Sequence, residues 1–252
     1  MKYLTILLLA AVLFTSATAF ENENSTPLSG KEIIEKVDAN MAAENRIIES
    51  DMIIHGKRRD RAVSSKTWSI GTDQSFSEYL SPAREAGTKM LKVEGKLWIY
   101  TPQTDRTIQI SGHMLRQSVM GSDLSYEDMM DDRELLEVYD AKHTGEEVID
   151  GRKCYIIELS AKVEDVAYHT QKMWVDAERF VPLQQEMYAK SGQLLKRTNL
   201  SNIKKVDGRW FPMTMIYKDV LKDGKGTEYR ITKIAFNQEI PDYIFTKAAL
   251  KK

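Results

Sequence analysis

The residues best suited to metal binding or nucleophilic catalysis are scattered through this sequence. Its four histidines form no HxxxH, HExxH or HxH pair, so any metal site would have to be assembled by the fold: His55, His113, His143 and His169. The sole cysteine, Cys154, excludes an intramolecular disulfide. We interpret it as a small buried hydrophobe, with a reactive thiol as the alternative.

Carboxylates gather in one segment, but their spacing is not that of a catalytic or metal-binding motif. The segment lacks the alternating ligands and the turn glycine of a calcium loop, although it holds Asp123, Glu127, Asp128, Asp131 and Asp132. Spacing of Ser125 and Asp128 predicts helix capping instead. Glu158 and Glu186 lie in alternating segments where a solvated strand face explains them. With no GxSxG, phosphate-loop or GxGxxG motif, we expect no enzyme, no metal and no cofactor.

The acidic segment belongs to a longer central insert, residues 112–132, which lacks the two-residue alternation of a strand. Its apolar residues recur at spacings of three and four, which predicts short helical turns, and Gly112 and Gly121 divide it. Methionines in the insert can adapt to irregular apolar partners. We expect a movable lid whose apolar contacts are made by Met114, Leu115, Val119 and Met120. A fixed helix that plugs the core is the alternative.

A helix is expected near the N-terminus, over residues 30–44. Ser29 and Glu32 have the spacing of a capping box, and Ile33, Ile34, Val37 and Met41 form one apolar stripe. Such a helix must pack against another element.

The remaining sequence predicts short antiparallel strands joined by tight turns. The strands are expected at 46–55, 61–70, 75–80, 88–93, 97–101, 106–111, 135–141, 147–148, 153–161, 168–176, 183–188, 194–203, 210–217 and 227–236. Residues 240–250 predict a short proline-started helix or turn. We expect a mainly β (α+β) fold, in which a strongly curved antiparallel sheet forms an incomplete barrel. Its concave face would be covered by the N-terminal helix and the central insert.

Apolar strand residues are candidates to line a cavity on that concave face. They are Trp68, Leu91, Val93, Ile108, Ile110, Tyr155, Ile157, Leu159, Phe211, Met213 and Met215. The alternative is that these side chains simply pack the core.

Residues 1–19 predict a signal peptide, because Lys2 precedes an apolar run that ends at a small-residue site. Cleavage is expected after Ala19, without lipid modification, which leaves residues 20–252 as a single domain in the periplasm. The formal net charge of −1 gives no broad electrostatic reason to bind nucleic acid.

Several segments resemble the LolA-like family, in particular its branch of outer-membrane lipoprotein-sorting proteins. The resemblance lies in KEIIEKVDANM (31–41), SPAREAGTKML (81–91), LWIYTP (97–102), ISGHMLRQSVMGSDLSYEDM (110–129) and the long stretch 173–217. It implies an incomplete barrel with a lidded cavity that carries acyl chains through the periplasm. It also implies a strand arginine that holds the lid, for which Arg46, Arg58, Arg59 and Arg61 are the nearby candidates.

The expected function is therefore a carrier for lipoprotein acyl chains or other lipids, with transient inner- or outer-membrane protein partners. The alternative is a lipid-sensing regulatory module of the cell envelope, similar to RseB, or an accessory to a membrane exporter. Arg84, in the loop between Pro82 and Gly87, is a candidate contact for a headgroup or partner; a solvated loop charge is the alternative.

Overall fold

Residues 27–56, 58–130 and 133–252 are described by the structure, a computed structural model. The predicted signal peptide, together with Asp131 and Asp132, lies outside these residues. In the described part of the chain, no helix has the length and apolarity needed to cross a membrane.

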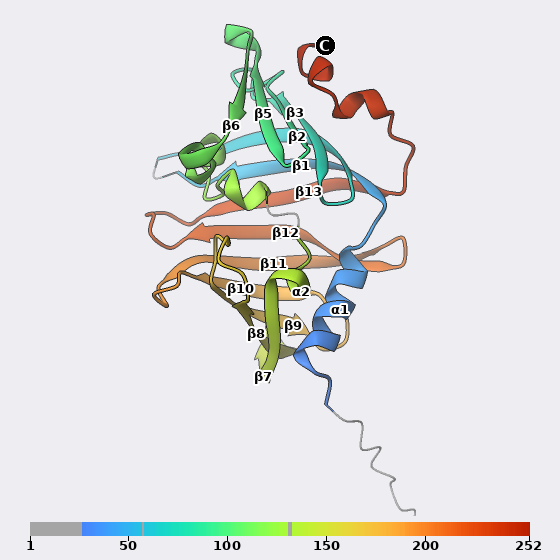
Figure 1. Cartoon of the computed structure of the whole chain (residues 1–252), viewed down its shortest axis with the longest axis vertical. Helices are drawn as coiled ribbons and strands as arrows, with labels where there is room; N and C mark the ends of the chain where they lie inside the picture. The colour runs from blue at the N-terminus through green and yellow to red at the C-terminus, as the bar shows by residue number, and fades with distance from the viewer. Residues whose placement is uncertain (1–26, 57, 131–132) are drawn as a thin grey trace, which may run out of the picture.

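A single antiparallel sheet of thirteen strands dominates the fold, as the sequence predicts (Figure 1). One half contains β1 (Asn45–Ile54), β2 (Arg61–Ile70), β3 (Gln74–Ser81), β4 (Lys89–Val93), β5 (Lys96–Thr101) and β6 (Arg106–Ile110). The other half contains β7 (Tyr139–Ile149), β8 (Arg152–Ala161), β9 (Thr170–Asp176), β10 (Pro182–Tyr188), β11 (Leu194–Val206), β12 (Arg209–Asp219) and β13 (Thr227–Phe236). The order is β6-β5-β4-β3-β2-β1-β13-β12-β11-β10-β9-β8-β7.

This order places β6 and β7, which are consecutive in sequence, at opposite edges of an open sheet. Strands β1 and β13, from opposite ends of the chain, pair at its centre. The segment between β6 and β7 must therefore run from one edge of the sheet to the other. That segment contains the central insert, which is thus positioned by topology to cross the sheet.

Short helical turns form in the insert, as its apolar spacing predicts, but they are 3₁₀ turns. They are η2 (Gly112–Arg116), η3 (Val119–Gly121) and η4 (Glu127–Met129). A one-turn helix, α2 (Leu135–Val138), then leads into β7. The prediction of a strand over 135–141 is wrong for its first four residues, because Leu135, Leu136 and Val138 pack against the N-terminal helix instead of following a strand alternation.

Helix α1 (Gly30–Met41) begins with the predicted capping box: Ser29 Oγ accepts from the Glu32 N–H at 3.2 Å, and Glu32 accepts from the Ser29 N–H at 2.8 Å. It ends at Met41, before the predicted residue 44, because the backbone of Ala42 is extended. The buried stripe of Ile33, Ile34 and Val37 packs on β7, β8 and β9.

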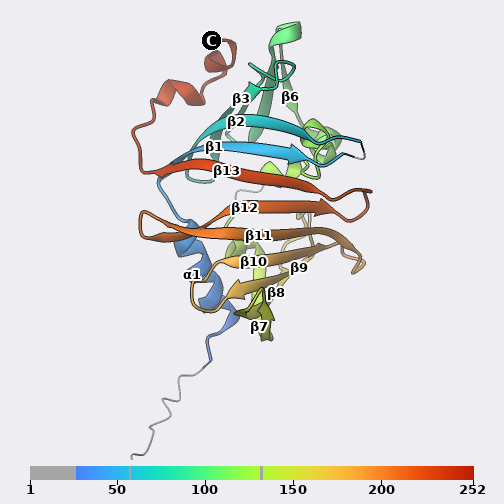
Figure 2. The same cartoon turned by 180° about the vertical axis from the view of Figure 1, so that it is seen from behind.

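Both α1 and the insert lie on one side of the sheet, in front of it in Figure 1 and behind it in Figure 2. The opposite face of β1–β5 is covered by η5 (Asp242–Phe245) and η6 (Lys247–Lys251), which confirm the expected short C-terminal turns. Strand β4 shows the division: Met90 packs with the insert, whereas the next residue, Leu91, packs with Phe245 and Leu250.

Candidate functional site

A cavity of about 450 Å³ lies between α1, the insert and strands β9–β12. We call it the central cavity. Its lining includes Val37, Asp38, Met41, Leu124, Glu127, Asp128, Arg133, Leu135, Ala167, Tyr168, Gln171, Met173, Pro182, Gln185, Met187, Lys196, Thr198, Leu200, Phe211, Pro212, Met215 and Tyr217. Most of these side chains are apolar, so the cavity provides an environment for an apolar ligand with a few polar groups at defined places.

The main polar group on the insert side of the central cavity is Asp128. Its carboxylate forms an ion pair with Lys196 of β11, accepts from the Tyr168 hydroxyl, and accepts from the Ser125 N–H at 2.7 Å. Burial acts to raise the pKa of Asp128, but the Lys196 charge and these hydrogen bonds outweigh it and hold the pKa below its ordinary value. Asp128 is therefore a carboxylate at neutral pH, and it ties the insert to the sheet.

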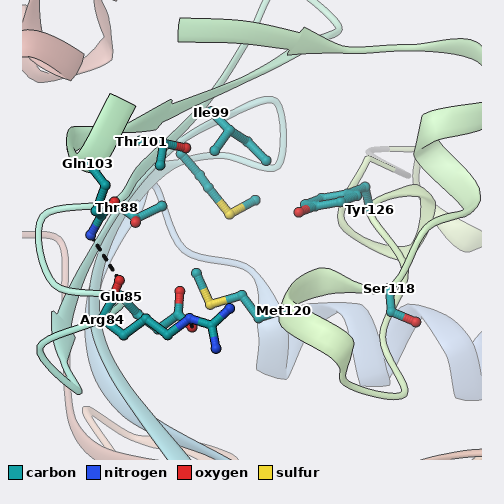
Figure 3. A pocket seen from close by; sticks show the side chains of 10 residues that line it. Arg84, Glu85, Thr88, Ile99, Thr101, Gln103, Ser118, Met120 and Tyr126 are labelled. Atoms are coloured by element: carbon teal, nitrogen blue, oxygen red, sulfur yellow. Dashed lines mark hydrogen bonds and ion pairs between the residues drawn. The ribbon is translucent and has the colours of Figure 1, made fainter. Parts of the chain in front are cut away.

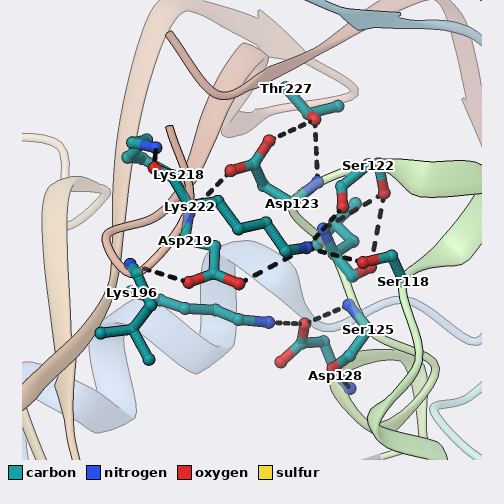
Figure 4. Close-up of polar contacts among 12 residues, drawn as sticks. Ser118, Ser122, Asp123, Ser125, Asp128, Lys196, Lys218, Asp219, Lys222 and Thr227 are labelled. Atoms are coloured by element: carbon teal, nitrogen blue, oxygen red, sulfur yellow. Dashed lines mark hydrogen bonds and ion pairs between the residues drawn. The ribbon is translucent and has the colours of Figure 1, made fainter. Parts of the chain in front are cut away.

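A second polar contact joins the insert to the centre of the sheet (Figure 4). Thr227 of β13, which is fully buried, donates from Oγ1 to Asp123 Oδ2 at 2.9 Å and accepts from the Asp123 N–H at 3.0 Å. The Asp219 N–H of β12 donates to Asp123 Oδ1 at 3.0 Å. Beside this contact, Lys222 donates to Ser118 Oγ at 2.6 Å.

Two cationic side chains hold the insert from the half of the sheet that contains β1–β6. Arg61 of β2 donates to the Met120 carbonyl oxygen, and its guanidinium also pairs with Glu85 at 3.1 Å. Lys92 of β4 donates to the Met129 carbonyl oxygen at 3.1 Å. Of the four arginines considered for holding the lid, Arg61 is thus the one that contacts the insert through a described hydrogen bond.

Three of the four predicted lid residues, Met114, Leu115 and Met120, pack over β1–β6. Val119 is 2% exposed, and Met114, Leu115 and Met120 are partly buried against a cluster that includes Met52 and the predicted cavity residue Ile110. These contacts fit both a closed lid and a core plug, so they leave movement of the insert as an expectation.

Six of the eleven predicted cavity residues line the central cavity or belong to the buried clusters beside it and under α1. Phe211 and Met215 line the cavity and Met213 is buried in the same cluster. The other three belong to the cluster under α1, namely Tyr155, Ile157 and Leu159.

Other predicted cavity residues lie elsewhere. Trp68, Leu91 and Val93 pack in the cluster under the C-terminal segment, on the face opposite the insert. The sequence could not assign them to this face, because strand alternation identifies two faces without saying which one is concave. Ile110 is buried under the insert, and Ile108, on the edge strand β6, is 44% exposed.

A second pocket, of about 460 Å³, separates the insert from the hairpins of β3–β5 (Figure 3). Met90, Ile99 and Met120 give it an apolar surface, and Arg84 and Glu85 lie at its border. The Arg84 side chain is 88% exposed, consistent with the interpretation of a solvated loop charge.

A third pocket, which we call the arginine chamber, adjoins the central cavity and was not anticipated from the sequence. It has a volume of about 710 Å³ and is lined by Arg46, Arg133 and Arg209 among other residues. Arg46 and Arg209 are 163 positions apart in the numbering, and only the pairing of β1 with β13 and of β13 with β12 brings their strands together. No local sequence pattern marks this arrangement.

Comparison with known proteins gives a consistent picture of this architecture. A family model described as "Uncharacterized protein" matches residues 71–252, and no curated protein matches the chain. A solved domain from Vibrio parahaemolyticus, named for outer membrane lipoprotein sorting, is 25% identical with a TM-score of 0.76, over 88% of this chain and 98% of that one.

Two further solved structures are similar over 88% of this chain. A DUF1329 family protein from Desulfovibrio piger is 27% identical with a TM-score of 0.78 over 97% of its own chain. A LolA superfamily protein from Nitrosomonas europaea is 24% identical, with a TM-score of 0.73 over 99% of its chain, and it supports the fold. With the family model spanning most of its sequence and these structures sharing its fold, the chain belongs to the LolA-like family.

Proposed function

We propose that this protein is a periplasmic, non-enzymatic carrier that shields the acyl chains of a lipoprotein or another lipid in the central cavity. The observation that carries the proposal is the mostly apolar lining of this cavity, which lies between α1, the insert and β9–β12. Export by the predicted signal peptide, with cleavage after Ala19, is part of the proposal. So are transient contacts with membrane proteins that load and unload the carrier.

Burial of acyl chain supplies the affinity in this proposal. Each buried methylene contributes about 0.8 kcal/mol, so ten methylenes contribute about 8 kcal/mol before the costs of association. The costs of association are subtracted from this gain, so binding is weaker than the dissociation constant of about 1 μM to which 8 kcal/mol would correspond, and a carrier of this kind can release its ligand as well as hold it.

The insert acts as the lid in this mechanism, and together with α1 it covers the concave face of an incomplete barrel. Met114, Leu115 and Met120 pack on the sheet in the closed state, in which Val119 is also buried, and these four residues move away from the sheet as a lipid enters. Arg61 holds the lid through the Met120 carbonyl. Methionine side chains allow the insert to repack around different ligands.

Lipid binding can be tested on protein purified from the periplasm. Native mass spectrometry should detect co-purified lipid, and the delipidated protein should take up a fluorescent fatty acid. Leu200→Trp, which fills part of the central cavity, should reduce uptake, whereas Val148→Trp, at a side chain that is 66% exposed, should not. Absence of co-purified lipid together with absence of uptake would contradict the proposed function.

A further inference from the structure

The arginine chamber opens beside the central cavity, and the two share part of their lining. Asp38, Met41, Arg133 and Leu135 line both. The central cavity is mostly apolar, whereas the chamber is surrounded by charged side chains. One ligand with an apolar part and a polar part could therefore occupy both spaces at once.

Two arginines of the chamber lack a carboxylate partner among the residues that the structure describes, and the guanidinium of one of them, Arg209, lies 5.2 Å from the centre of the Phe236 ring. Arg46 is partly buried, and burial together with the charge of Arg209 lowers the pKa of Arg46. The Nη1 atom of Arg209 is buried without a hydrogen-bond partner. Among the described residues, neither arginine forms an ion pair. A buried, unpaired N–H on a cation costs free energy, and two like charges side by side add to that cost.

The carboxylates of the same chamber do not compensate these charges. Asp38, Glu44 and Glu134 line it, but none is paired with Arg46 or Arg209. Burial raises the pKa of Asp38, and the nearby charges of Glu134 and Glu35 raise it further, so its surroundings are acidic. Among the described residues, the chamber thus has one acidic region and a separate pair of arginines without an anionic partner.

We propose, as an extension of the proposed lipid carriage, that Arg46 and Arg209 bind a phosphate group, while the apolar part of the same ligand lies in the central cavity. A guanidinium presents parallel N–H donors that match phosphate oxygens in pairs, and a phosphate has enough oxygens to accept from two guanidinium groups. A bound phosphate gives Arg209 Nη1 an acceptor and screens the repulsion between the two arginines. The phosphate can come from a lipid headgroup or from solution.

Binding measurements with three probes distinguish these sources. The probes are phosphatidic acid, a diacylglycerol with the same acyl chains, and inorganic phosphate, each titrated into the delipidated full-length mature protein. The variants are Arg46→Gln and Arg209→Gln, so that a folding defect in one leaves the other informative. Arg106→Gln, at an exposed position on edge strand β6, is the matched control.

The wild-type protein and Arg106→Gln should bind phosphatidic acid about 10- to 100-fold more tightly than diacylglycerol, because charge-assisted hydrogen bonds are gained. Arg46→Gln and Arg209→Gln should lose most of this preference, with diacylglycerol affinity unchanged. Equal wild-type affinity for the two lipids, or arginine variants that behave as Arg106→Gln does, would overturn the headgroup site and leave the carrier function intact.

Failure of the carrier function gives a different pattern. If neither lipid binds, the proposal of lipid carriage is wrong. The titration with inorganic phosphate then tests whether the two arginines form an anion site. Phosphate binding that is lost in Arg209→Gln then supports a site for free phosphate. Absence of phosphate binding in the wild type overturns the arginine site as well.

Discussion

Asp128 of the insert and Lys196 of β11 form an ion pair in which each side chain is 13% exposed. The pair joins the segment that crosses the sheet to the wall of the central cavity. Removing one partner leaves the other charge buried and uncompensated. The pair therefore favours the closed arrangement of insert and sheet.

Replacing Asp128 with Asn should weaken the attachment of the insert by about 2–3 kcal/mol, because Lys196 loses its counter-charge. Amide hydrogen exchange should become faster in the insert while the β-sheet core is less affected. The double variant Asp128→Asn with Lys196→Met is the control, and it should recover part of the loss. Equal exchange rates in wild type and Asp128→Asn would show that the pair does not hold the insert.

The same ion pair predicts a pH dependence with a definite sign. The pKa of Asp128 is lower in the folded protein than in the unfolded chain, so the pair contributes fully above about pH 4 and is lost as the pH falls through the lowered pKa. Protection of the insert, measured as the exchange rate relative to the intrinsic rate at each pH, should stay constant from neutral pH to mildly acidic pH and fall only in stronger acid. Asp128→Asn should remove this acid-dependent step.

Arg61→Gln should release the insert from the other half of the sheet. The substitution removes the hydrogen bond to the Met120 carbonyl and the pair with Glu85, at a cost of about 1 kcal/mol because the side chain is 38% exposed. We expect faster release of a bound fluorescent fatty acid. Arg59→Gln, at an exposed position just before β2, should leave release unchanged; a similar effect of both variants would argue against a specific role for Arg61.

Close contact between α1 and β7 can be tested at Gly30. A Cβ atom there would lie 2.6 Å from the Ala141 carbonyl oxygen and 2.8 Å from the His143 nitrogen, so Gly30→Ala should destabilise the fold by about 1–3 kcal/mol. Gly145→Ala, within β7 itself, is the control, because nothing lies within 4 Å of its added methyl group. Thermal unfolding should show a lower Tm only for Gly30→Ala.

Local patterns in the sequence predicted most elements of the fold. The capping box of Ser29 and Glu32 and the stripe of Ile33 and Val37 marked α1, and turn residues separated the strands. The absence of alternation identified the insert. These features depend on neighbouring residues, which is why a single sequence contains them.

The inner and outer faces of the sheet could not be predicted in the same way. Met90 and Leu91 are equally apolar, and only the distant segments that cover them, the insert and the C-terminal turns, determine the face of each. Arg46 was considered only as a candidate arginine for holding the lid, and its position beside Arg209 was missed for a related reason. Their proximity follows from the pairing of strands at opposite ends of the chain, and each looks like an ordinary strand charge in the sequence.

The most direct test of the account is to lock the insert onto the sheet. Asp123 of the insert and Thr227 of β13 are the pair chosen for a disulfide, since they are in direct contact: Thr227 Oγ1 lies 3.0 Å from the Asp123 nitrogen and 2.9 Å from Oδ2. The variant carries Asp123→Cys, Thr227→Cys and Cys154→Ser, the last to prevent mispairing.

Uptake of a fluorescent fatty acid should be measured on this variant before and after reduction, with circular dichroism to confirm that both forms are folded. The oxidised form should lose uptake and the reduced form should regain it, because the insert must separate from the sheet to admit an acyl chain. Equal uptake by the two forms would show that the insert is a fixed part of the core and would contradict the lid mechanism.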